Sequence, residues 1–160
     1  MSSMQIEIDW RGKLEMSFPV RRCSSVKLDH TGCVTHSFDI EIYAPFFSNT
    51  GTTSLERVNM AYNKLNGSVP ILRDLENLTQ VIFRDNEFDS VQAQSFSSNS
   101  LNVVDLSYQR HDGFTLFDHA FSSLPSGIKI VLIGNTISTI PSHAFDGLNN
   151  ASLDLTDLSI

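Results

Sequence analysis

An eleven-residue pattern recurs along the chain with a nearly constant spacing, and this period constrains the fold more than any other feature. Residues 55–65 return as residues 78–88 after 23 positions, apolar for apolar and Asn63 for Asn86. Residues 101–111 repeat the pattern again, with Gln109 in the Asn place. Copies in phase begin near residues 127 and 150, and another near residue 23. A fixed period of this length indicates a repeat architecture and not a single globular core.

The apolar residues at positions four and six of each copy predict a strand. They alternate with their neighbours, which is the period of two expected when one face of a strand is buried. Parallel stacking of such strands forms one wall of a solenoid. The inward pairs are predicted to be Val58/Met60, Val81/Phe83, Val104/Leu106, Ile130/Leu132 and Leu153/Leu155.

The amide at position nine is expected to be structural. It stands where the chain leaves the strand, and it can donate to and accept from backbone groups of adjacent coils that would otherwise be buried unpaired. Large aromatic residues recur between the strands, where rings would fill the far half of each coil. The residues to which we assign structural roles are Asn63, Asn86, Asn135, Phe96, Phe121 and Phe145.

The spaced Leu, Val and Asn residues resemble the leucine-rich repeat family, whose pattern is Leu-x-x-Leu-x-Leu-x-x-Asn-x-Leu. The resemblance covers nearly the whole chain and fits the repeat type of roughly 23 residues. It implies an α/β fold, a leucine-rich-repeat solenoid (horseshoe) with a parallel concave β-sheet and a mostly irregular or short-helix convex side. We expect one domain over 1–160, with an irregular or partial first repeat over 1–22 and repeats that begin near 23, 55, 78, 101, 127 and 150. Ile6 and Ile8 suggest the remnant of an earlier copy.

Composition and motifs argue against several functions. The chain has 11 Lys and Arg against 18 Asp and Glu, a net charge of −7, which disfavours nucleic acid as a partner. It lacks the long apolar run of a membrane span. The sequence has no Gly-x-Ser-x-Gly elbow, no Gly-rich phosphate loop and no His or Cys residues at zinc-ligand spacing. We therefore predict no enzymatic activity, no catalytic residues, no metal and no cofactor.

Protein recognition is the function that the pattern favours. The strand residues that do not face the core would form an exposed surface of mixed charge with two tyrosine rings, and Tyr and Arg are enriched at protein interfaces. We predict a protein ligand bound on this concave face, with Tyr62, Arg84 and Tyr108 at its centre. The alternative is a structural spacer or scaffold segment of a larger receptor or adaptor. The predicted binding residues are Arg57, Asn59, Tyr62, Gln80, Arg84, Asp85, Asp105, Tyr108 and Lys129.

The compartment stays open at this point. Cys23 and Cys33 lie too far apart along one strand for a disulfide, so we expect two buried thiols. Three sequons, at Asn66, Asn77 and Asn150, are candidate glycosylation sites, but chance predicts almost as many.

Neither end of the sequence shows a cap, and solenoids need one. We therefore interpret the chain as a fragment of a longer protein, with self-association through the uncapped ends as the competing explanation. The chain would be cytoplasmic if it is complete, because no signal peptide is present. It would be extracellular or at the cell surface if it comes from a receptor ectodomain.

Overall fold

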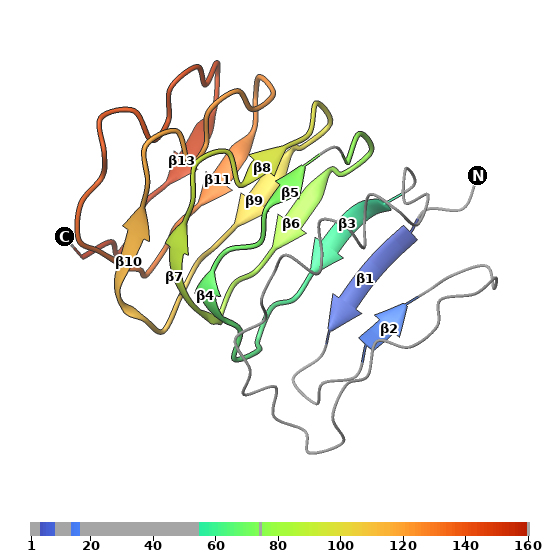
Figure 1. The fold of residues 1–160 in the computed structure, drawn as a ribbon, viewed down its shortest axis with the longest axis horizontal. Coiled ribbons are helices and arrows are strands. Elements are labelled where there is room, and N and C mark those ends of the chain that lie inside the picture. Colours follow the sequence, from blue (N-terminus) through green and yellow to red (C-terminus); the bar gives the residue numbers. More distant parts are fainter. Residues whose placement is uncertain (1–3, 9–13, 17–54, 74, 160) are drawn as a thin grey trace.

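The chain forms a β-solenoid in which each repeat contributes one coil (Figure 1). The structure is a computed structural model and describes residues 4–8, 14–16, 55–73 and 75–159. The strands of these residues fall into three sheets of seven, four and two strands. The segment from Cys23 to Cys33, with its predicted repeat and its two thiols, lies outside the described residues.

The largest sheet stacks the strands that the repeat predicts. Its order is β13-β11-β9-β6-β3-β1-β2, and every neighbouring pair is parallel except β1 and β2. Val58 pairs with Val81 and Val81 with Val104, so equivalent positions of successive copies lie side by side. The strands are β1 (Met4–Ile8), β2 (Leu14–Met16), β3 (Leu55–Asn59), β6 (Gln80–Ile82), β9 (Val103–Asp105), β11 (Lys129–Val131) and β13 (Ser152–Asp154).

The N-terminal end of this sheet includes strands from the first sixteen residues. On the side of β3 away from β6 the neighbouring strand is β1, with Ile6 opposite Val58. Beyond β1 the sheet continues with β2 in the antiparallel direction. The Ile6 and Ile8 segment therefore supplies the strand next to the first strong repeat.

The opposite wall of the solenoid consists of short strands and turns. Within the described part of the chain no helix occurs on this side. A four-stranded parallel sheet has the order β12-β10-β7-β4, and a two-stranded parallel sheet pairs β5 with β8. These strands are β4 (Asn66–Ser68), β5 (Leu72–Arg73), β7 (Glu87–Val91), β8 (Phe96–Ser97), β10 (Asp112–Leu116) and β12 (Thr136–Ile137).

The core lies between the two walls. The residues at positions four and six are buried through four copies, from Val58 and Met60 to Ile130 and Leu132. Leu153, the same position in β13, is 40% exposed, whereas Ile130 is fully buried. The reason is that β13 is the edge strand of its sheet, so only β11 flanks it.

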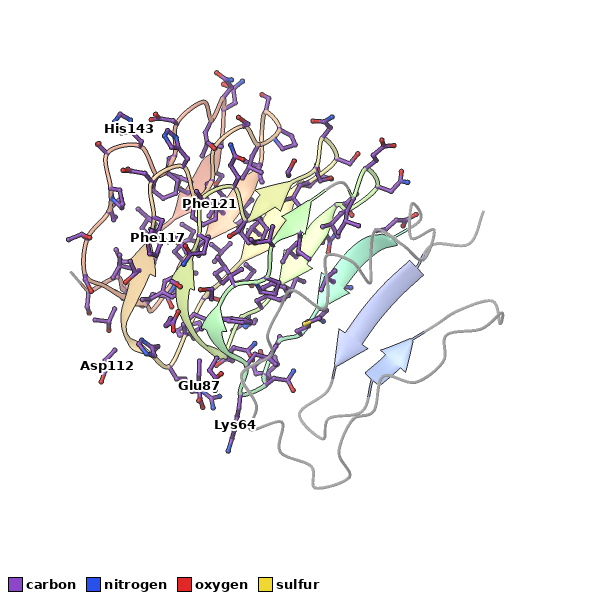
Figure 2. The ribbon with its side chains drawn as sticks, viewed as in Figure 1. Lys64, Glu87, Asp112, Phe117, Phe121 and His143 are labelled. Carbon is purple, nitrogen blue, oxygen red and sulfur yellow. The ribbon has the colours of Figure 1, made fainter. Side chains whose placement is uncertain are left out.

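Phenylalanine rings stack in the half of the core away from the large sheet. Phe121 lies between Phe96 and Phe145, with ring centroids 5.9 and 5.4 Å apart and planes within 10° of parallel. Phe96 and Phe121 are fully buried, and Phe145 packs against them from the last coil. Figure 2 shows Phe121 toward the upper end of the second sheet, opposite the end where Lys64, Glu87 and Asp112 lie.

The position-nine amides connect successive coils. Asn86 Nδ2 donates to the carbonyls of Met60 (2.8 Å) and Phe83 (2.9 Å), and its Oδ1 accepts the Leu65 N–H (3.0 Å). Asn135 makes equivalent bonds with the coil before it, and Asn63 donates to two carbonyls of its own coil.

Gln109 reproduces this arrangement despite its longer side chain. Its Nε2 donates to the Phe83 carbonyl (3.0 Å) and its Oε1 accepts the Phe88 N–H (3.1 Å). In the last copy Leu158 stands at this position, without an amide, and packs against the core.

Candidate protein-binding surface

A left-handed residue follows every strand of the large sheet from β3 to β13. Position eight has a φ of 60° at Tyr62, 55° at Asp85, 56° at Tyr108, 65° at Gly134 and 55° at Asp157. Only glycine adopts this conformation without steric cost. In the first four of these turns the N–H of the left-handed residue still donates to the next coil, as in Tyr62 N to Arg84 O (3.0 Å) and Tyr108 N to Ile133 O (2.8 Å).

This turn projects two tyrosines and an arginine from three successive coils. The Arg84 guanidinium carbon lies 5.4 Å from the centroid of the Tyr62 ring and 5.6 Å from that of the Tyr108 ring. Both distances are within the range of a cation–π contact. Tyr62 is 55% exposed and Tyr108 42% exposed. The three residues that the sequence placed at the centre of the surface are therefore in contact, and we call them the Tyr-Arg-Tyr row.

Asp85 fixes the arginine of this row. Arg84 Nε donates to Asp85 Oδ2 at 3.3 Å, and Nη2 of Arg110 lies 3.9 Å from Asp85 Oδ1. Burial acts to lower the pKa of Arg84, but the hydrogen bond to Asp85 and the electrostatic interactions with Tyr62, Asp105 and Asp85 act to raise it, and the net pKa is raised. Arg84 is therefore a permanent cation whose charge is balanced within the surface.

Gly134 provides the space for the Tyr108 ring. A Cβ at Gly134 would lie 2.5 Å from both Cδ1 and Cε1 of Tyr108, closer than any real contact. The ring is thus held between the bare backbone of the next coil and the Arg84 guanidinium. Sequence reasoning missed Gly134 and Arg110; the glycine at position eight of an otherwise occupied pattern was the available signal.

Two of the predicted binding residues also make hydrogen bonds within the turn that follows their strand. Asn59 Oδ1 accepts the Ala61 N–H (3.1 Å), and Asp105 Oδ1 accepts both the N–H (3.0 Å) and the hydroxyl (2.6 Å) of Ser107. Asp154 makes the same pair of bonds to Thr156. Short polar side chains commonly hold turns in this way.

The other predicted binding residues form a row across the strands. Arg57 pairs with Gln80, Gln80 with Val103, and Val103 with Lys129. Lys129 is exposed, Gln80 is half-buried, and Nε of Arg57 is buried without a hydrogen-bond partner among the residues that the structure describes. The surface is also more apolar than predicted, since three half-buried residues and the buried Val131 stand at its outward positions: Ile82, Val103, Ile133 and Val131.

The three sequon asparagines differ in exposure. Asn66 begins β4 and is half-buried, whereas Asn77 and Asn150 lie in exposed turns. Among the described residues no group of three or more His, Cys, Asp or Glu side chains is placed to hold a metal ion. In the same part of the chain, no helix has the length and hydrophobicity needed to cross a membrane.

Two characterised proteins resemble this chain in sequence. It is 29% identical over 100 residues to the leucine-rich repeat-containing G-protein coupled receptor 5 of Rattus norvegicus, a match that covers 62% of this chain and 11% of the receptor. It is 32% identical over 112 residues to the receptor-like kinase TMK2 of Arabidopsis thaliana, covering 67% of this chain and 12% of the kinase. The matched segment thus spans about a tenth of either relative. No family model and no solved structure matches the chain.

One coil per repeat, parallel strands in register and an amide ladder at their ends define a β-solenoid repeat protein. The repeat pattern, together with the similarity to a leucine-rich repeat-containing receptor and to a receptor-like kinase, identifies this chain as a leucine-rich repeat protein of the roughly 23-residue repeat type. The likeness to receptors suggests a protein-interaction module.

Proposed function

We propose that this chain is a non-enzymatic recognition module that binds a protein partner through its concave face. By this face we mean the outward residues of β3, β6, β9, β11 and β13 and the turns that follow them. The observation that carries the proposal is the Tyr-Arg-Tyr row, in which two exposed tyrosines contact one arginine. Tyr and Arg are the residue types that most often dominate binding energy at interfaces.

The geometry of the row supports this role in a second way. Side chains that are already ordered lose less conformational entropy on binding than free ones. Arg84 is held by Asp85 and by both rings, and Tyr108 is seated against Gly134. We assign Asn59 and Asp105 mainly to the turns, because Oδ1 of each residue accepts hydrogen bonds there. Gln80, Lys129 and Arg57 extend the proposed surface across the strands.

Photo-crosslinking tests which face binds. A photoreactive phenylalanine analogue is placed at Gln80 or Lys129 on the concave face, and at Phe117 or Ser123 in turns of the opposite wall as matched controls. After irradiation in an extract of the source organism, we expect crosslinks to the same protein from both concave positions and from neither control. Combining the label with Tyr62→Ala, Arg84→Ala and Tyr108→Ala should remove these crosslinks.

Two other outcomes would contradict the proposal. Crosslinks only from Phe117 and Ser123 would place the binding surface on the other wall. Equal and unspecific crosslinking from all four positions would favour the spacer or scaffold function. A second triple variant, Phe117→Ala, His119→Ala and His143→Ala, removes exposed rings from the opposite wall and should leave the concave crosslinks unchanged.

A further inference from the structure

The two exposed tyrosines of the row lie two coils apart, and their spacing is set by the sheet. Backbone hydrogen bonds join Tyr62 to Arg84 and Tyr108 to Ile133, so the turns remain in the same ladder as the strands. Neighbouring strands lie about 4.8 Å apart, so Tyr62 and Tyr108 recur at about 9.6 Å along the solenoid. A ligand peptide that lies along the row would therefore contact one tyrosine ring and then, two coils further, the other.

This spacing discriminates between ligand conformations. A polyproline II helix has three residues per turn and a rise of about 3.1 Å, so equivalent side chains recur every ~9.3 Å. Same-side residues of an extended β-strand recur at about 6.6 Å, which does not match. In an α-helix, residues seven positions apart lie on the same face and recur at about 10.5 Å, which is the nearest helical match to the tyrosine spacing. The helix carbonyls, however, are already hydrogen-bonded within the helix and cannot accept from Arg84.

The polar groups of the row fit a polyproline II chain for a second reason. Among the described residues, Arg84 uses Nε on Asp85, while its two Nη groups make no hydrogen bond. They are therefore donors available to a ligand. A polyproline II chain has no internal hydrogen bonds, so its carbonyl oxygens are free acceptors. Partial negative charge on the ligand would then meet the positive guanidinium between the two rings.

The charges around the row disfavour a strongly acidic ligand. Two carboxylates face two guanidinium groups here, since Asp85 lies beside both Arg84 and Arg110 and Asp105 also acts on Arg84. The whole chain carries a net charge of −7. A neutral ligand that combines apolar rings with free carbonyls suits this surface better than a carboxylate-rich one.

We propose that the Tyr-Arg-Tyr row binds a proline-rich segment in the polyproline II conformation. One proline packs on Tyr62, a second proline three residues further packs on Tyr108, and Arg84 donates to a carbonyl between them. This rests on the proposed function of the concave face and adds the chemistry of the partner.

Fluorescence anisotropy with fluorescein-labelled nonaproline tests the proposal on the full chain. A Gly-Ser peptide and an alternating Glu-Gly peptide of equal length serve as matched probes. We expect nonaproline to bind at least about tenfold more tightly than either one. The double variant Tyr62→Ala, Tyr108→Ala should reduce nonaproline affinity at least about tenfold. Each lost aromatic contact is expected to weaken the affinity by about a factor of three or more.

Two further variants complete the test. Arg84→Lys keeps the charge but loses the planar fork, and we expect it to weaken nonaproline binding at least threefold, roughly the effect of one lost hydrogen bond. Phe117→Ala, at an exposed ring on the opposite wall, should leave binding unchanged. If the double variant fails to fold by circular dichroism, NMR titration of the wild-type chain replaces it. Nonaproline should then shift the amides of 62, 84 and 108 and not that of 117.

The outcomes separate this inference from the proposed function. Equal binding of nonaproline and the Gly-Ser peptide, stronger binding of the Glu-Gly peptide, or nonaproline affinity unaffected by the tyrosine substitutions would each overturn it. If concave crosslinks to a protein persist in that case, the recognition function stands and only the proline-rich partner is wrong. If crosslinking fails as well, both proposals fall.

Discussion

Single side chains complete the backbone pairing of this solenoid. The chain must turn sharply after each strand of the large sheet, and these turns leave carbonyls and N–H groups inside the coil. Asn86 bonds to four of them, two in the preceding coil and two in its own. Leaving a buried polar group without its hydrogen-bond partner lowers the stability of the folded protein by about 1–3 kcal/mol. The amide ladder is therefore a requirement of the fold.

Asn86→Ala should lower the free energy of unfolding by about 1–3 kcal/mol, because it leaves the Leu65 N–H unpaired and removes one of the two side-chain donors to the Met60 carbonyl, which keeps its bond from Asn63. Urea denaturation followed by circular dichroism measures the change. Asn102→Ala, an exposed asparagine on the large sheet, is the control and should change stability by less than about 0.5 kcal/mol. Similar values for the two variants would show that the ladder contributes nothing.

Gly134 and Gly127 allow the effect of the Tyr108 contact to be isolated. Both glycines have positive φ, but a Cβ at Gly127 meets nothing within 4 Å, whereas one at Gly134 collides with Tyr108. Gly127→Ala should therefore cost only the conformational strain, about 1–2 kcal/mol. Gly134→Ala should cost at least about 1 kcal/mol more, because overpacking adds to the strain.

NMR adds a structural readout to these unfolding measurements. In Gly134→Ala the Tyr108 ring signals should shift, and in Gly127→Ala they should stay in place. An unshifted Tyr108 ring in Gly134→Ala would show that this glycine does not position the tyrosine.

At the scale of elements, the two walls of the solenoid are held by different means. The large sheet is held by in-register parallel pairing and by small or branched residues such as Val58, Val81 and Val104. The opposite wall is divided between a four-stranded and a two-stranded sheet, and the core beside it is filled by the stack of Phe96, Phe121 and Phe145. Because each ring contacts the ring of the next coil, the stack joins neighbouring repeats where backbone pairing is sparse.

Phe121→Ala should destabilise the chain by about 3–5 kcal/mol, since it opens a cavity in the middle of this stack. Phe117→Ala removes a ring of the same size that is 44% exposed, and should cost less than about 1 kcal/mol. Thermal or urea unfolding of both variants provides the comparison. A loss at Phe121 no larger than that at Phe117 would rule out the stack as a link between coils.

At the scale of the whole molecule, the stability of each coil depends on its contacts with the neighbouring coils. Each coil contacts mainly the coils on either side, so an edge coil has about half of the stabilising contacts of an inner one. The exposure of Leu153 in β13, compared with the complete burial of Val104 in β9, reflects this difference. Stability is therefore expected to vary along the solenoid.

Hydrogen exchange should detect that gradient. We expect the amides of β13 to exchange at least about tenfold faster than those of β9, because local opening of an edge coil breaks fewer contacts. Exchange measured by NMR or mass spectrometry on the 160-residue chain gives the rates. Equal protection of β9 and β13 would mean that the last coil is covered in solution, and light scattering would then show whether a second copy covers it.

The sequence by itself determined the period, the inward residues and the amide position, because all three repeat along the chain with the spacing of one coil. It also selected Tyr62, Arg84 and Tyr108 by their residue types, although position eight has the parity of the buried positions four and six. The left-handed turn found in the structure is what exposes the two tyrosines. Only the tertiary structure decided that Arg84 lies between the two rings and that β1 stands next to β3. The tertiary structure also decided that Oδ1 of Asn59 and Oδ1 of Asp105 accept hydrogen bonds from the following turns. The physical reason is that periodicity fixes which face of a strand a side chain occupies, whereas its contacts depend on the neighbouring coils and on turn angles that no periodic pattern encodes.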